Sequence, residues 1–251
     1  MRHHEKYRIL TTDTYDGVAR PEAIDEFMQD SAGGHFTALG HDDYEMHFVD
    51  HQAFILSRIA IEFLKDIPEK AAPDFYTWYS EGYAATFPRS YEVKLGDEVC
   101  VRANSIWALV DTETKRLIRA KEFYLPPEQA EDKHELGIPD RYKLPKDAVF
   151  TEAGDMLVMA WQTDINMHLN NARYVDPMWS CIPDIAKRKV KALAIHYAHE
   201  SLEGERLKIM VSQPYPCEFE AYAEDHEIFY TTMDGDDGIR ADAMWVVSKI
   251  K

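Results

Sequence analysis

Short runs of β-branched and aromatic residues recur along the chain, separated by polar and turn-forming residues. Runs of this length and composition are typical of β-strands. The predicted strands are FILSRIAIEF (54–63), EVCVRANSIWALV (98–110), RLIRAKEFYL (116–125), RLKIMV (206–211) and CEFEAYAE (217–224). The sequence MDGDDG at 233–238 predicts a hairpin, because Asp-Gly pairs favour the tight turns that join antiparallel strands.

Each half of the chain has one predicted helix, at about 21–31 and about 171–182, preceded by a loop and a short strand (7–11 and 155–161). Pro177 lies inside the second helix, where it removes a backbone N–H and should kink or shorten the helix. One helix followed by consecutive antiparallel strands is an α+β pattern. The predicted fold is therefore α+β, a tandem (double) hotdog, with each half an antiparallel sheet wrapped round a central helix.

The two halves also align as an internal repeat. Residues 12–29 (TDTYDGVARPEAIDEFMQ) align without a gap with residues 163–180 (TDINMHLNNARYVDPMWS). Residues 105–125 and 227–247 also correspond, since each reads as a strand, a polar turn and a second strand. The Pro-rich, charged stretch between the halves predicts a linker or a wrapping segment. The expected divisions are an N-terminal hotdog at 1–125, a linker at 126–150 and a C-terminal hotdog at 151–251.

Composition indicates a folded protein and argues against two kinds of partner. Apolar residues make up 45% of the chain, enough for a core, and no apolar run approaches the ~20 residues that cross a bilayer. The formal net charge of −17 should repel the phosphates of nucleic acids. The charged N-terminus lacks the apolar segment of a signal peptide, and three cysteines without motif spacing predict reduced thiols. We expect a cytoplasmic protein with no nucleic-acid partner and no membrane span.

One basic cluster interrupts this acidic chain, in AKRKVKA at 186–192. Its cations are Lys187, Arg188, Lys189 and Lys191. They are either a solvated helix end, where cations complement the helix dipole, or a docking patch for an acidic partner. If the cluster is only a solvated face, Arg141 and Lys143 are the next docking candidates.

Polar side chains crowd into residues 163–171 and run directly into an apolar, aromatic segment. They are Asp164, Asn166, His168, Asn170 and Asn171. A polar turn that caps a helix is one interpretation, and Asn170 is the expected N-cap. A catalytic group at a helix start is the other, because histidine exchanges protons near neutral pH and unpaired helix N–H groups suit an anion.

The wider pattern resembles a known family. Asp-x-Asn-x-His-Leu-Asn-Asn-x-x-Tyr at 164–174 resembles the signature of acyl-ACP thioesterases, which are double-hotdog enzymes, and IHYAHES at 195–201 is similar to their second motif. In the first half, TWYS (77–80), RSYEV (89–93) and the stretch 96–119 resemble strands of the family's N-terminal hotdog. The absence of a transit peptide suggests a bacterial-type member.

The resemblance implies a thioester hydrolase that acts on fatty acyl-ACP, releases free fatty acid and holo-ACP, and ends fatty-acid synthesis. It implies an acyl carrier protein as partner and neither a cofactor nor a metal. Catalytic roles are carried over to Asp164, Asn166, His168 and Glu200. Substrate-binding roles are expected for Ser201, Asn170 and Asn171.

Two positions depart from a fully catalytic repeat. Ser201 stands where plant members have cysteine, and a serine is a poor nucleophile without a base in contact. We therefore expect attack by water, promoted by Glu200 and His168. In the first repeat, Tyr15 and Gly17 stand where the second has Asn166 and His168, so that half has lost the catalytic residues. The resemblance implies that it holds the acyl chain.

Other functions stay open at this stage. An acyl-CoA thioesterase would need cations for the nucleotide phosphates. GGHF at 33–36 is similar to the Gly-His-Phe-Pro motif of hotdog dehydratases, although Thr37 replaces the proline. A non-catalytic acyl-binding module is a further alternative. The sequence leaves acyl chain length and a homodimer open.

Overall fold

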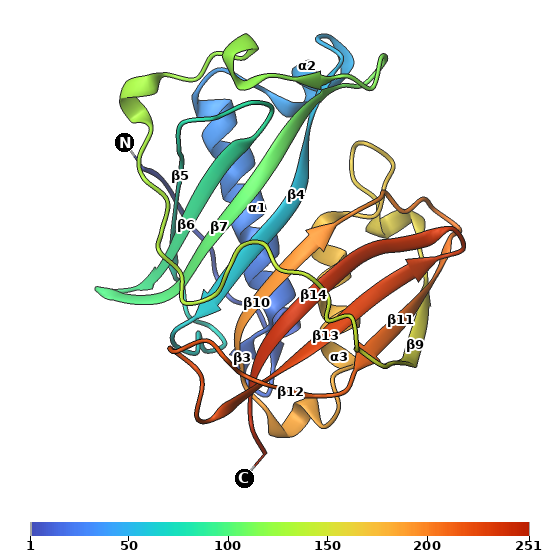
Figure 1. Ribbon diagram of the computed structural model, residues 1–251. Coiled ribbons are helices and arrows are strands. Elements are labelled where there is room, and N and C mark those ends of the chain that lie inside the picture. The colour runs from blue at the N-terminus through green and yellow to red at the C-terminus, as the bar shows by residue number, and fades with distance from the viewer. Residues whose placement is uncertain (1, 251) are drawn as a thin grey trace. The chain divides into compact units, whose positions relative to one another are not determined.

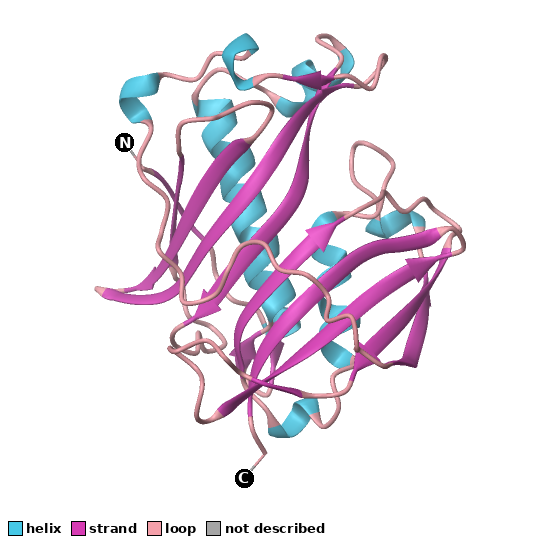
Figure 2. Ribbon diagram, in the orientation of Figure 1, coloured by secondary structure: helices cyan, strands magenta, loops and turns pink. Residues whose placement is uncertain are grey.

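The computed structural model describes residues 2–250 and divides into two compact units, Met1–Ile59 with Leu64–Leu136, and Ala60–Phe63 with Gly137–Lys251 (Figure 1). Each unit combines β-strands with helical segments (Figure 2). Among the described residues, no helix is both long and apolar enough to span a membrane.

The sheet of the first unit has the strand order β1-β5-β6-β7-β4, and the neighbours from β1 to β7 pair antiparallel. Its strands are β1 His3–Lys6, β4 Gln52–Phe63, β5 Asp74–Tyr79, β6 Phe87–Leu95 and β7 Glu98–Asp111, and β8 Leu117–Ile118 pairs with β7. A separate pair is formed by β2 Thr14–Tyr15 and β3 Val18–Ala19. The helices are α1 Pro21–Ala38 and α2 Asp43–Phe48, with 3-10 turns at Thr11–Asp13, Ala120–Glu122 and Pro127–Gln129.

Helix α1 lies against the sheet of this unit (Figure 1). Pro21 occupies its first position, where the missing N–H has no cost. One buried stripe at four-residue spacing, Ile24, Met28, Ala32 and Phe36, continues past the predicted end at residue 31, which explains the longer helix. A side chain at Gly34 would collide with the Glu5 carboxylate of β1, so a glycine inside the helix permits close packing.

The sheet of the second unit has the order β10-β14-β13-β11-β9. Its strands are β9 Phe150–Leu157, β10 Val190–Tyr197, β11 Arg206–Ser212, β13 His226–Gly235 and β14 Gly238–Ser248, and β12 Tyr215–Pro216 pairs with β13. Its helical segments are 3-10 turns at Ala160–Gln162, Asn171–Tyr174 and Ile185–Lys187 and the helix α3 Val175–Ser180, which packs on β11 and β13. The predicted hairpin is confirmed, because Gly235 faces Gly238 across the β13–β14 turn.

Both units thus have the predicted α+β arrangement, but several local predictions are wrong. The segment 116–125 forms only the two residues of β8, because Phe123 and Leu125 pack as side chains on the cluster around Phe87 and Leu109. The segment 217–224 forms turns, and Tyr222 donates a hydrogen bond to Glu62 at 2.7 Å. Apolar side chains can thus be buried in these two segments although the backbone does not pair in a sheet.

The predicted elements flanking the polar loops also shift. The first strand is His3–Lys6 where 7–11 was predicted, and the strand predicted at 155–161 is β9, Phe150–Leu157. The helix predicted at 171–182 is a 3-10 turn followed by the six-residue α3. Pro177 lies in the first turn of α3, where a proline is tolerated, so it shortens the helix instead of kinking it.

The residues between β8 and β9 are held by hydrogen bonds within the unit to which each of them belongs. The Trp78 indole donates to the carbonyl of Asp132 at 3.0 Å, and the Asn104 amide donates to the carbonyl of His134 at 2.8 Å. Further on, the Tyr142 hydroxyl donates to Asp242 at 2.5 Å. The division into two hotdogs and a linker at 126–150 stays a prediction.

Candidate active site

The loop between β9 and α3 is held by the Asp164 carboxylate. One of its oxygens accepts from the backbone N–H of Asn166 at 2.8 Å and of His168 at 3.4 Å, and the N–H of Asp164 donates to the His168 carbonyl at 2.9 Å. Met167 adopts φ +62°, the left-handed conformation that reverses the chain. Asp164 therefore closes a local turn, as aspartate side chains do.

A second segment runs alongside this loop. The N–H of Leu169 donates to the carbonyl of Ser201 at 2.8 Å, and His168 pairs with Leu202 in a β-bridge. The pairing places His168 Nε2 3.1 Å from Glu200 Oε2. The histidine side chain is 29% exposed and the glutamate 59%, so both can meet a molecule from solution. Two residues far apart in sequence thus form one polar pair.

Asp164 and Asn166 form a second polar pair in the loop. The Asn166 amide donates to Asp164 at 3.4 Å, a long hydrogen bond. Asp164 reaches His168 through the backbone N–H and not through the imidazole ring. It therefore fixes the backbone that carries His168.

Ser201 is fully buried, and the hydroxyl of Tyr174 donates to its Oγ at 2.9 Å. Burial is the main cause that raises the pKa of Tyr174 to about 12, so this tyrosine stays protonated near neutral pH. Within residues 2–250, no histidine or carboxylate contacts the Ser201 hydroxyl. Tyr174 is a site residue that the sequence reasoning left without a role, although it ends the motif at 164–174.

The turn that carries Glu200 is fixed by an ion pair that the sequence did not reveal. Glu205 accepts from the N–H of Leu202 at 3.2 Å and from Arg240 Nε of β14 at 2.8 Å. The N–H of Ala198 donates to the Arg240 carbonyl at 2.8 Å. This arrangement ties the Glu200 segment to the sheet, which limits how far the carboxylate can move from His168.

The two remaining asparagines support the loop. Asn170 is the N-cap, as predicted, and its side chain accepts from the N–H of Ala172 at 2.9 Å. The carbonyl of Asn171 accepts from the Tyr197 hydroxyl at 3.1 Å. Their substrate-binding roles stay predictions. The long helix expected to hold an anion at its start is replaced by a 3-10 turn and a short α3.

The basic cluster is partly engaged in structural contacts. Arg188 is only 7% exposed, pairs with Glu227, donates to the Ser248 carbonyl at 3.0 Å and lies over the Phe229 ring. Lys187 pairs with Asp184 at 2.8 Å. Lys189 and Lys191 complete the cluster at the start of β10, where docking stays a prediction.

The first repeat keeps the loop but not the histidine. Asp13 accepts from the N–H of Leu10 at 2.7 Å. The histidine of GGHF, His35, is buried in α1 with its Nδ1 3.1 Å from an Arg89 nitrogen. Burial first, and then the Arg89 charge, lower the pKa of His35 to about 3. A histidine with so low a pKa is a weak base, which argues against a dehydratase site.

Two hotdog units in one chain, with one polar site in the second unit, define a double-hotdog protein. Residues 151–246 match the model of the acyl-ACP thioesterase C-terminal domain. This region contains the whole candidate site, and in it the chain is similar to the C-terminal domain of acyl-ACP thioesterases. A comparison with curated proteins finds no match.

Solved structures of similar proteins extend the likeness of fold to the full chain. A provisionally named oleoyl thioesterase from Lactobacillus plantarum is 16% identical, with 100% of this chain and 97% of that chain covered and a TM-score of 0.83. An acyl-ACP thioesterase from Bacteroides thetaiotaomicron is 16% identical over 98% of both chains, with a TM-score of 0.80. The 12:0-ACP thioesterase from Umbellularia californica is 16% identical over 98% of this chain and 93% of that chain, with a TM-score of 0.78. The predicted double hotdog is confirmed.

Proposed function

We propose that this protein hydrolyses the thioester of fatty acyl-ACP, releases free fatty acid and holo-ACP, and so ends fatty-acid synthesis in the cytoplasm. The observation that carries the proposal is the contact of His168 Nε2 with Glu200 Oε2 at 3.1 Å, inside the region that matches the family. An imidazole and a carboxylate in contact can pass a proton between substrate, water and solvent.

In this mechanism the His168–Glu200 pair removes a proton from a water molecule. The water oxygen attacks the thioester carbonyl carbon, and the carbonyl oxygen becomes an oxyanion. The second N–H of the Asn166 amide is available to stabilise that oxyanion, since the first donates to Asp164. The C–S bond then breaks, and the pair returns the proton to the departing thiolate.

Water is the proposed nucleophile because no activating base contacts the Ser201 hydroxyl in the described part of the chain. Its hydroxyl is buried and accepts from Tyr174, which is protonated near neutral pH. A serine nucleophile needs a base within hydrogen-bond reach. Ser201 therefore acts as a structural neighbour whose carbonyl accepts from Leu169 and keeps the Glu200 segment beside the loop.

The test is a hydrolysis assay with acyl-ACPs and acyl-CoAs of graded chain length, applied to wild type, His168→Ala, Glu200→Gln and Asp164→Ala. Each variant should lower kcat/KM by at least about 10²-fold, a typical loss for acid–base residues. Glu203→Gln is the matched control, since Glu203 is an exposed carboxylate in the same turn, and it should retain wild-type activity. Wild-type turnover in the first two variants, with unchanged circular dichroism, would refute the assignment. Faster turnover of acyl-CoA than of acyl-ACP would reject the proposed substrate.

A further inference from the structure

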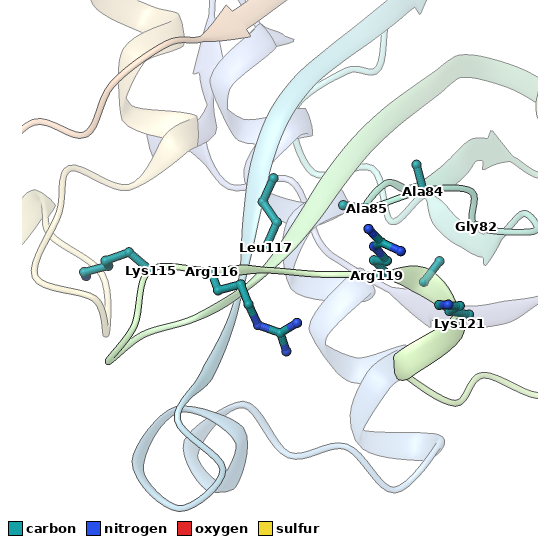
Figure 3. A pocket seen from close by; sticks show the side chains of 9 residues that line it. Gly82, Ala84, Ala85, Lys115, Arg116, Leu117, Arg119 and Lys121 are labelled. Carbon is teal, nitrogen blue, oxygen red and sulfur yellow. The ribbon is translucent and has the colours of Figure 1, made fainter.

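A pocket of about 820 Å³ opens in the first unit (Figure 3). One wall is the connection between β5 and β6, with Gly82, Ala84 and Ala85. The opposite wall runs from the turn after β7 through β8 into the following 3-10 turn. Its lining residues are Lys115, Arg116, Leu117, Arg119, Ala120 and Lys121.

Four of the nine lining residues are cations, in a chain with a net charge of −17. Arg116 pairs with Glu122 at 3.3 Å. Within residues 2–250, Lys115, Arg119 and Lys121 have no carboxylate at ion-pair distance. Figure 3 shows Arg119 directed toward Ala84 and Ala85, so at least one guanidinium faces the opposite wall.

Three acidic residues close in sequence to the cationic wall, Asp111, Glu113 and Glu122, are engaged in other contacts. Asp111 accepts from the backbone N–H groups of Glu113 and Thr114, at 3.1 and 2.8 Å. Glu113 lies 3.7 Å from His51, and Glu122 pairs with Arg116. These three carboxylates therefore form no ion pair with Lys115, Arg119 or Lys121.

The walls are held in place before any ligand binds. The N–H of Ala120 donates to the carbonyl of Ala84 at 2.9 Å, which ties one wall to the other. A side chain at Gly82 would lie 2.8 Å from the Ala120 methyl group, so the walls meet where only glycine fits. Ala84 adopts φ +51°, a left-handed conformation that is costly for alanine. Such strain persists only where the surroundings enforce it, and it is common at binding sites.

The lining combines two kinds of surface. Cations occupy one side, and Ala84, Ala85 and the half-exposed Leu117 (53%) present small apolar surfaces. A simple inorganic ion would use only the cations. A phosphate ester with a flat organic group would use both, with its charges on the cations and its ring on the apolar surface.

We propose that this pocket binds a nucleoside phosphate that carries at least two negative charges. Phosphate oxygens contact Arg119 and Lys121, and Lys115 adds long-range attraction. The nucleoside packs on Ala85 and Leu117. The same chemistry occurs at the nucleotide end of coenzyme A and in free nucleotides. The inference does not depend on the proposed hydrolysis.

The probe is adenosine 3′,5′-bisphosphate, titrated calorimetrically into the full chain at low and at moderate salt. The double variant Arg119→Gln with Lys121→Gln should weaken binding by at least about tenfold, because charge-assisted hydrogen bonds are lost. The matched control, Lys143→Gln with Lys146→Gln, removes the same charge elsewhere in the chain and should leave affinity unchanged. Ala85→Phe should weaken the bisphosphate while inorganic phosphate is unaffected, since it fills the apolar side only. Circular dichroism checks the fold of each variant.

Two further titrations identify the source of the ligand. Equal affinities for coenzyme A and adenosine bisphosphate support recognition of the coenzyme's nucleotide end, whereas tighter binding of ATP supports a free nucleotide. The proposal is overturned if none of these binds, if inorganic phosphate binds as tightly as the bisphosphate, or if the control pair weakens binding as much as the pocket pair. It is also overturned if only an acidic carrier protein binds at this surface.

Discussion

Asp25 is fully buried in α1, and its replacement by asparagine should change how stability depends on pH. Its Oδ2 accepts from the Gln29 amide at 3.0 Å, and Oδ1 has no hydrogen-bond partner among residues 2–250. Burial above all raises the pKa of Asp25 from 3.8 to about 7, and the nearby Glu22 and Glu26 raise it further while Gln29 lowers it.

The direction of the effect follows from where the proton binds. Between pH 3.8 and about 7, the folded chain holds a proton on Asp25 that the unfolded chain has released. Stability therefore falls as pH rises through this window, and it is flat below and above it. A shift of roughly 3 units, at about 1.4 kcal/mol per unit, amounts to ~4 kcal/mol. The Asp25→Asn variant cannot ionise and lacks this slope.

Urea unfolding of wild type and Asp25→Asn at pH 4.5, 6, 7 and 8 measures the difference in unfolding free energy. The unpaired amide N–H of the asparagine costs ~1–3 kcal/mol at every pH. At pH 4.5 the unfolding free energy of the variant should therefore be equal to or lower than that of wild type. The difference, variant minus wild type, should rise by about 3–4 kcal/mol between pH 4.5 and pH 8. Asp50→Asn, at an exposed carboxylate, controls for the change of charge. A difference that stays constant across this range would refute the reasoning.

Three other substitutions have defined outcomes. Ser201→Ala should retain at least about a tenth of wild-type activity, because water is the proposed nucleophile, and Tyr174→Phe should do likewise; an acyl group trapped on Ser201 in mass spectrometry would contradict this. Arg89→Met should leave the unfolding free energy unchanged or raise it by up to ~2 kcal/mol, because a buried guanidinium that has no carboxylate partner among the described residues is costly. A loss above ~3 kcal/mol in urea unfolding would show that Arg89 stabilises the fold. Replacing Lys189 and Lys191 by glutamate should raise KM for acyl-ACP several-fold and leave KM for a short carrier-free thioester unchanged. Equal changes for both substrates would show that the cluster is a solvated face with no docking role.

The sequence by itself determined the elements whose signals are local. The four-residue stripe of α1 and the MDGDDG hairpin depend on residues that are neighbours along the chain. The motif at 164–174 gave the polar loop and the Asn170 cap for the same reason, since Asp164 and Asn170 bond to backbone groups within four positions. Short-range hydrogen bonds and hydrophobic periodicity depend only on residues that are close together in the sequence, so the sequence alone can predict them.

Only the tertiary structure decided which distant groups meet. The contact between His168 and Glu200 exists because backbone pairing brings their segments together, and no local pattern encodes that pairing. The Tyr174–Ser201 hydrogen bond arises in the same way. The runs at 116–125 and 217–224 have strand-like composition, yet their side chains fill gaps in the packing. The hydrophobic effect is non-directional and does not specify backbone pairing. Composition alone therefore cannot show whether such a run forms a strand of a sheet or packs its side chains against one.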